Sequence, residues 1–104
     1  MREIRKTRNF AQWLDGLNDL RARARVQVRI ERLASGLAGD VKSVAGGVSE
    51  LRIDYGPGYR VYFTKRGTSV VILLAGGDKK SQSADIRLAL RLARTLEETN
   101  DDQD

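Results

Sequence analysis

The sequence contains no cysteine and no histidine, and each absence removes classes of function. Without cysteine the chain can form no disulfide, offer no thiol nucleophile and hold no thiolate-bound zinc. Without histidine it lacks the commonest general base and the commonest ligand of transition metals. The longest apolar run, residues 70–75, is far too short to cross a bilayer, and the first twenty residues contain no signal-peptide core. A reducing cytoplasm is therefore the expected location.

Acidic residues are scarce in most of the chain. Over 104 residues, 19 Lys and Arg stand against 14 Asp and Glu, a formal charge of +5. Five of the acids lie in the last eight residues, so residues 1–96 carry 19 cations and nine acids, a net charge of +10. So basic a body attracts polyanions, and nucleic acid is the first candidate partner. The length predicts one domain over 1–96, followed by an acidic, flexible tail at 97–104.

Hydrophobic periodicity predicts helices in the first third of the chain. Residues 2–6 alternate weakly and predict an edge strand, after which Thr7 is suited to cap a helix. Apolar residues then recur at helical spacing in two segments, the second at roughly 19–35, which predicts an antiparallel helix hairpin. The second segment also carries a row of arginines along one face: Arg21, Arg25, Arg29 and Arg32.

From about residue 41 the period changes to two, which predicts strands. Residues 48–55 and 59–64 alternate on either side of a Gly-Pro-Gly turn. Residues 69–75 are apolar throughout, which predicts a central strand covered on both faces. A last helix is expected to begin near residues 81–83. The predicted order is β-α-α-β-β-β-α, an α+β domain with an antiparallel meander sheet packed against the N-terminal helix hairpin and the C-terminal helix.

Several cations are predicted to converge on one surface. Arg52 and Arg60 have the parity of the strand face that points away from the core, and Tyr62 shares that face beside Arg60. Lys79 and Lys80 follow the last strand. A concave surface of arginine, lysine and tyrosine suits a phosphate backbone with stacked bases.

Each of these sets also has a plainer interpretation. Four arginines on a helix are commonly a solvated face, and Asp19 and Glu31 can partly neutralise them. The two lysines after the last strand can be an exposed turn. Arg60 is harder to explain in this way, because a lone arginine among Tyr and Val is costly unless it is exposed or paired. Tyr55 and Tyr59 have the parity of core residues.

Nucleotide and metal sites are not predicted. The glycines after the last strand do not form a P-loop, because no glycine directly precedes the lysine that adjoins Ser81. Asp54, Asp78 and Asp85 lack the spacing of a metal site, so we expect no metal and no other cofactor.

Two stretches, VSELRIDYGPGYRVYF at 48–63 and LLAGGDKKSQSADI at 73–86, resemble the RelE/ParE toxin superfamily and, more narrowly, its HigB-like addiction module killer group. The resemblance runs from about residue 3 to residue 95, and the two stretches together are far more specific than either alone. It implies a RelE/ParE-like fold and the toxin of a type II toxin–antitoxin system.

RelE-like members bind the ribosomal A site and cut mRNA there without a metal. The resemblance therefore implies a cytoplasmic, ribosome-dependent endoribonuclease, an mRNA interferase that inhibits translation. Arg52 and Arg60 match the strand cations of that family, and Lys80 or Lys79 matches its basic residue after the last strand. The arginines of the 19–35 helix would hold phosphates of ribosomal RNA.

The implied partners are the ribosome with its mRNA and rRNA, and a cognate antitoxin. In this group the antitoxin is usually a helix-turn-helix DNA-binding protein, so operator DNA would be reached only through it. No membrane is implied.

The general base is where this sequence departs from the family pattern. Attack by the ribose 2′-hydroxyl needs a base, cations for the phosphorane and an acid for the leaving 5′-oxygen. RelE-like enzymes often place Tyr or His near the start of the last helix, where this chain has Ile86. Asp85, with Gln82 one turn earlier, is our hypothesis for the base. Asp54 departs too, because some members have lysine there.

These departures leave two other interpretations open. The chain can be a non-enzymatic ParE-like toxin that binds and poisons DNA gyrase, since such proteins share the fold and lack a catalytic set. It can also be a degraded toxin that is kept as a DNA-binding partner of its antitoxin.

Overall fold

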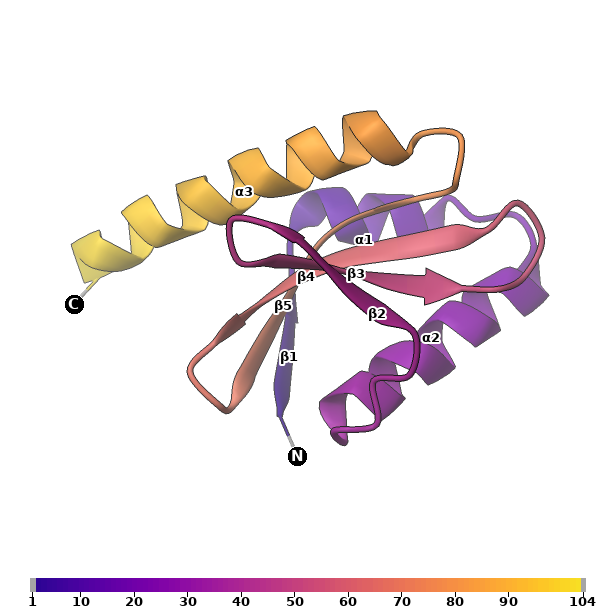
Figure 1. Ribbon diagram of the computed structural model, residues 1–104, viewed down its shortest axis with the longest axis horizontal. Helices are drawn as coiled ribbons and strands as arrows, with labels where there is room; N and C mark the ends of the chain where they lie inside the picture. Colours follow the sequence, from indigo (N-terminus) through magenta and orange to yellow (C-terminus); the bar gives the residue numbers. More distant parts are fainter. Residues whose placement is uncertain (1, 104) are drawn as a thin grey trace.

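The computed structural model describes the backbone of residues 2–103 and the side chains of residues 2–97. Within that part of the chain the fold is α+β, with five strands in one mixed sheet and three helices (Figure 1). The elements are, in chain order, β1 (Glu3–Lys6), α1 (Arg8–Asp15), α2 (Leu20–Ala34), β2 (Val41–Ala45), β3 (Val48–Ile53), β4 (Tyr59–Arg66), β5 (Val70–Gly77) and α3 (Gln82–Gln103).

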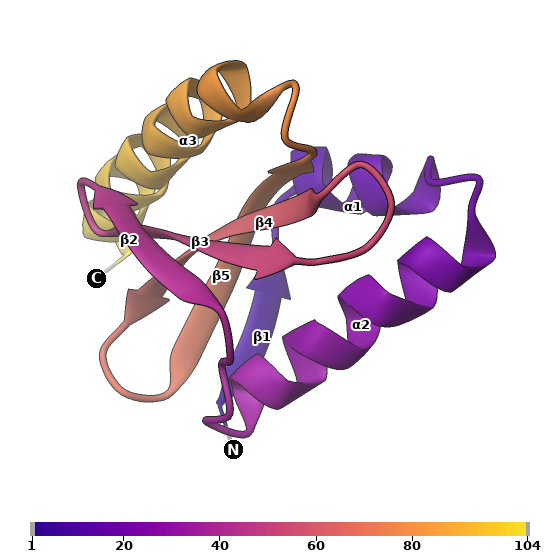
Figure 2. The same cartoon turned by 45° about the vertical axis from the view of Figure 1, so that its right-hand side comes forward.

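The strand order in the sheet is β1-β5-β4-β3-β2. Strands β2 to β5 form the predicted antiparallel meander, whereas β1 pairs with β5 in parallel. As predicted, β1 lies at an edge of the sheet (Figure 2). The predicted order lacked one strand, β2. Its sequence, VKSVA, does not alternate, and it is held in place by pairing with β3.

Helices cover both faces of the sheet, with α1 and α2 on one side and α3 on the other (Figure 2). One buried cluster joins Phe10 of α1 and Leu33 of α2 to the inner residues of β3, β4 and β5. The second joins Ala89 and Ala93 of α3 to the opposite face of the sheet. Residues 71–75 of β5 are buried throughout, which confirms the prediction of a strand covered on both faces.

Two side chains cap the first helices, as the sequence predicts for residue 7. The Thr7 hydroxyl accepts a hydrogen bond from the Phe10 amide and donates one to the Leu74 carbonyl at 2.6 Å, which ties the start of α1 to β5. Asp19 caps α2 in the same manner. In the described part of the chain, no helix is long and apolar enough to cross a membrane. The predicted flexible tail at 97–104 lies, from residue 98 onward, outside the described side chains, so its flexibility stays a prediction.

Candidate functional site

A cleft of about 410 Å³ opens where β3 and β4 meet their connecting turn. Its wall contains three cations, two carboxylates and the turn itself: Arg52, Arg60, Lys79, Asp40, Asp54 and residues 56–58. The turn lies close against the cations. Gly58 has a φ of +81°, and a Cβ placed there would lie 3.0 Å from Nη1 of Arg60 and 3.6 Å from Cβ of Lys79.

Two arginines stand opposite each other in this cleft. Arg52 of β3 and Arg60 of β4 are direct cross-strand partners, and Glu50 and Tyr62 form the next pair on the same face. Like charges in directly opposed positions destabilise a sheet. The pair therefore needs an anion nearby, and the neighbouring position supplies one.

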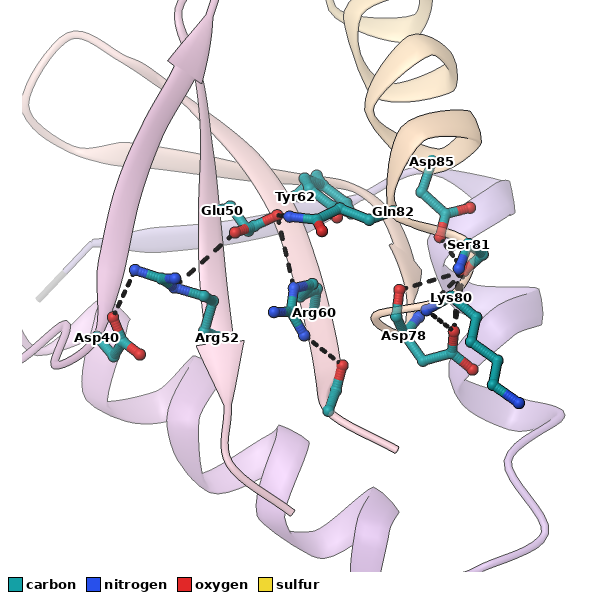
Figure 3. Close-up of polar contacts among 11 residues, drawn as sticks. Asp40, Glu50, Arg52, Arg60, Tyr62, Asp78, Lys80, Ser81, Gln82 and Asp85 are labelled. Atoms are coloured by element: carbon teal, nitrogen blue, oxygen red, sulfur yellow. Dashed lines mark hydrogen bonds and ion pairs between the residues drawn. The ribbon is translucent and has the colours of Figure 1, made fainter. Parts of the chain in front are cut away.

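That anion is Glu50, which is only 2% exposed. Its carboxylate accepts hydrogen bonds from the Tyr62 hydroxyl at 3.0 Å and from the Gln82 side-chain amide of α3 at 2.7 Å. It also forms ion pairs with Nε of Arg60 at 3.7 Å and Nε of Arg52 at 3.9 Å (Figure 3). Glu50 was not among the site residues predicted from the sequence. Its place two residues before Arg52, on the same strand face, was the signal that could have identified it.

The two arginines are held differently at their outer ends. Nη1 of Arg60 donates to the Gly58 carbonyl at 2.6 Å, and the side chain is 12% exposed. Nη2 of Arg52 forms an ion pair with Asp40 at 3.3 Å, and that side chain is 39% exposed. Arg60 is thus a recessed cation at the base of the cleft wall, and Arg52 is a more accessible one.

Tyr62 does not lie on an exposed surface, which corrects the prediction that it stacks on RNA. The side chain is fully buried in the cluster beneath α3. Burial, followed by the hydrogen bond to Glu50, raises the pKa of its hydroxyl well above the ordinary value. The strand parity was right, but the α3 helix covers this part of the sheet face.

The two lysines after β5 differ in their relation to the cleft. Lys79 lines the cleft, whereas the Lys80 side chain is exposed and points away from Arg60 (Figure 3). The lysine that lines the cleft with Arg52 and Arg60 is therefore Lys79, and the catalytic role of Lys80 stays a prediction. The Gln82 side-chain amide donates to the buried carboxylate of Glu50, and its predicted contact with RNA stays a prediction.

Asp85, the predicted general base, does not line the cleft. Its carboxylate accepts a hydrogen bond from the Ser81 hydroxyl and packs against the backbone of Gly77, where an added Cβ would lie 1.7 Å from Oδ2. Asp85 is also the acid in the first turn of α3, where the helix dipole favours a negative charge. These contacts assign it to the start of α3.

A second groove, of about 640 Å³, runs along α2. All four predicted arginines line it: Arg21, Arg25, Arg29 and Arg32. Ile53 and Asp54 belong to both the groove and the cleft, so the two hollows adjoin at the end of β3. A chain of phosphates can therefore pass from the α2 groove to the cleft.

The four arginines of the groove are not equivalent. Arg29 donates from Nη1 to the Arg52 carbonyl at 2.6 Å and from Nη2 to the Ala38 carbonyl at 3.1 Å, which fastens α2 to β3 and to the loop before β2. Arg25 lies over the Tyr55 ring at 4.6 Å. Arg21 and Arg32 are exposed. Arg29 thus has a structural role, and its predicted contact with RNA phosphates stays a prediction.

The chain matches one family model and one curated protein. Residues 12–96 match the family described as "Phage derived protein Gp49-like (DUF891)". The chain is also 50% identical over 94 residues to an uncharacterized protein of Haemophilus influenzae, and the match covers 90% of this chain and 95% of that protein. The Gp49-like family is associated with the toxins of toxin–antitoxin systems. The basic chain, with its arginine-lined cleft, belongs to this Gp49-like family.

Proposed function

We propose that this protein is the toxin of a type II toxin–antitoxin pair, of RelE/ParE-like fold, and that it inhibits translation by cutting mRNA on the ribosome. The observation that carries the proposal is the cleft in which Arg52, Arg60 and Lys79 converge. Three cations in a recess of this size suit a phosphodiester, and the adjoining groove extends the cationic surface for a longer strand.

The cations of the cleft match the charge that develops during RNA cleavage. The ribose 2′-oxygen attacks the adjacent phosphorus, its proton passes to a base, and the 5′-oxygen leaves with a proton from an acid. The products are a 2′,3′-cyclic phosphate and a 5′-hydroxyl. The intermediate phosphorane carries more negative charge than the starting diester, so fixed cations stabilise it more than they stabilise the substrate. Arg60, recessed and held by the Gly58 carbonyl, is the first candidate for this role.

The candidates for the general base are the carboxylates that line the cleft, and Asp85 is not among them. Asp40 and Asp54 both line the wall that holds Arg52 and Arg60. Asp40 already lies 3.3 Å from Nη2 of Arg52, so a hydroxyl beside it would also meet a cation. We therefore replace Asp85 by Asp40 and Asp54 as the candidates for proton transfer.

The partners follow from the same surface. Arg21, Arg25 and Arg32 are free to contact phosphates of rRNA or mRNA in the ribosomal complex. The family association supports a cognate antitoxin, and its helix-turn-helix character and contact with operator DNA remain part of this proposal. An antitoxin that neutralises the toxin must cover or distort the cationic cleft.

Primer extension on a defined mRNA in a reconstituted translation reaction tests the proposal. The wild-type protein is compared with Arg60→Ala and with Arg66→Ala, which removes the same charge at the other end of β4. Breaks should appear only on translated message, persist with Arg66→Ala and fall by about 100-fold or more with Arg60→Ala. Intact message together with growth arrest in cells would refute cleavage and would direct the search to a non-cleaving target such as DNA gyrase.

A further inference from the structure

Glu50 is a buried carboxylate with two kinds of partner, hydrogen-bond donors and the two arginines of the cleft. Burying a carboxylate is costly unless it is paired and hydrogen-bonded. The Tyr62 hydroxyl and the Gln82 amide both donate to Oε2 of Glu50. Both cleft arginines also direct their Nε atoms toward this carboxylate, Arg60 at 3.7 Å and Arg52 at 3.9 Å.

The inner ends of the two arginines depend on this carboxylate. The Nε atoms of Arg52 and Arg60 are buried and have no hydrogen-bond partner within the described residues. Glu50 is the acidic group that forms an ion pair with both of them. Their outer ends differ, because Arg60 is held by the Gly58 carbonyl and Arg52 by Asp40. Each guanidinium is therefore held from two sides, and Glu50 is the shared inner support.

The exposed fractions exclude a direct role in the reaction. At 2% exposure, the Glu50 carboxylate cannot reach a hydroxyl or a phosphate in the cleft. The guanidiniums stand between it and the cleft, with side chains 39% exposed for Arg52 and 12% exposed for Arg60. Any effect of Glu50 on a substrate must pass through them.

We infer that Glu50 is a positioning residue: its buried carboxylate holds Arg52 and Arg60 in the orientation that stabilises the charge of the phosphorane. The effect on cleavage rests on the proposed function, whereas the hold of Glu50 on the two arginines does not. Through Gln82 the same carboxylate also ties the first turn of α3 to β3.

Positioning predicts opposite effects on binding and on cleavage. Replacing Glu50 by glutamine removes one negative charge beside two arginines, so the attraction of RNA does not weaken. The arginines lose their shared inner anion, and small displacements of groups that stabilise a transition state can cost about 100-fold in rate. Loss of a merely structural contact would instead weaken folding, binding and cleavage together.

The test compares Glu50→Gln with Glu31→Gln, a matched loss of one charge at an exposed position of α2. Binding is measured with a short single-stranded RNA made uncleavable by 2′-O-methyl groups. Cleavage is measured as the maximal rate on translated mRNA. Glu50→Gln should bind no more weakly than Glu31→Gln yet cleave about 100-fold more slowly. Equal maximal rates for the two variants, or a parallel loss of binding and cleavage, would overturn the inference.

A second variant addresses the case in which Glu50→Gln does not fold. The exchange Glu50→Gln with Gln82→Glu keeps one carboxylate and one amide at their 2.7 Å contact and preserves the net charge. It moves the carboxylate away from the arginine stems and onto α3. The exchanged protein should fold and bind RNA but cleave as slowly as the single variant. Recovery of the wild-type rate would contradict positioning.

Arginine NMR separates this inference from the proposed function. The Nε–Hε signals of Arg52 and Arg60, assigned by Arg→Lys replacement, should be sharp and shifted from those of free arginine in the wild-type protein and in Glu31→Gln. In Glu50→Gln they should move to the position of mobile arginines. If the two signals already lie at the position of mobile arginines in the wild-type protein, Glu50 does not hold the arginines and the inference is wrong. If they shift as expected but no mRNA is cut, the inferred contact stands and the proposed reaction fails.

Discussion

Replacing Arg29 by alanine should destabilise the fold more than replacing any exposed arginine of the same helix. The guanidinium donates to the carbonyls of Arg52 and Ala38 at 2.6 Å and 3.1 Å, and its side chain is half-buried. A hydrogen bond from a charged donor contributes about 1.5–3 kcal/mol, and partial exposure favours the lower end. Two such bonds give an expected loss of about 3 kcal/mol in the free energy of unfolding.

Urea denaturation followed by circular dichroism measures this loss, with Arg32→Ala as the control. Arg32 lines the same groove but is exposed, so its replacement should change the unfolding free energy by no more than about 0.5 kcal/mol. For a chain of this length the Arg29→Ala loss corresponds to a fall in Tm of about 12 °C or more. Equal midpoints for the two variants would refute the structural role of Arg29.

Three further predictions follow from the contacts around the site. Asp85→Ala should lower stability by about 1 kcal/mol while leaving the maximal cleavage rate of the folded protein unchanged, which would be contradicted by a rate loss at full folding. Burial and the Glu50 contact raise the pKa of Tyr62 in the folded state above the ordinary value of 10.0. The contribution of the protonated hydroxyl to stability is therefore complete below pH 10 and is lost at higher pH. Urea denaturation at a series of pH values above 10 should show a smaller loss of unfolding free energy for Tyr62→Phe than for the wild type. Raised salt should weaken the complex with an acidic antitoxin segment, and an affinity independent of salt would contradict charge pairing at the cleft.

The period of the sequence was sufficient to predict most of the elements and the central pair of the site. Strict alternation placed Arg52 and Arg60 on one strand face, and the short turn between the strands made them opposite partners. The unbroken apolar run of β5 correctly predicted a strand buried on both sides. In each case a local pattern was enough, because one side chain in two must face the same way along a strand.

The rest of the site depended on packing that no local pattern records. Parity groups Glu50 and Tyr62 with the two arginines, but it does not state whether that face is open or covered. The packing of α3 determines this, because α3 covers the sheet face at Tyr62 and leaves the same face accessible at Arg52. Lys79 and Lys80 lie in a turn without a period, so their directions were undetermined until the turn was placed.

The parallel pairing of β1 with β5 limits when the sheet can form during synthesis of the chain. The Thr7 hydroxyl meets the Leu74 carbonyl across a sequence separation of 67 residues, and Glu3 pairs with Val70. A chain emerging from a ribosome must therefore leave its first strand without this partner until β5 has been synthesised. Contacts of such long range slow folding, and Lys79 follows β5 in the chain. The cleft therefore cannot be complete before the chain has been made as far as Lys79, long after its first strand.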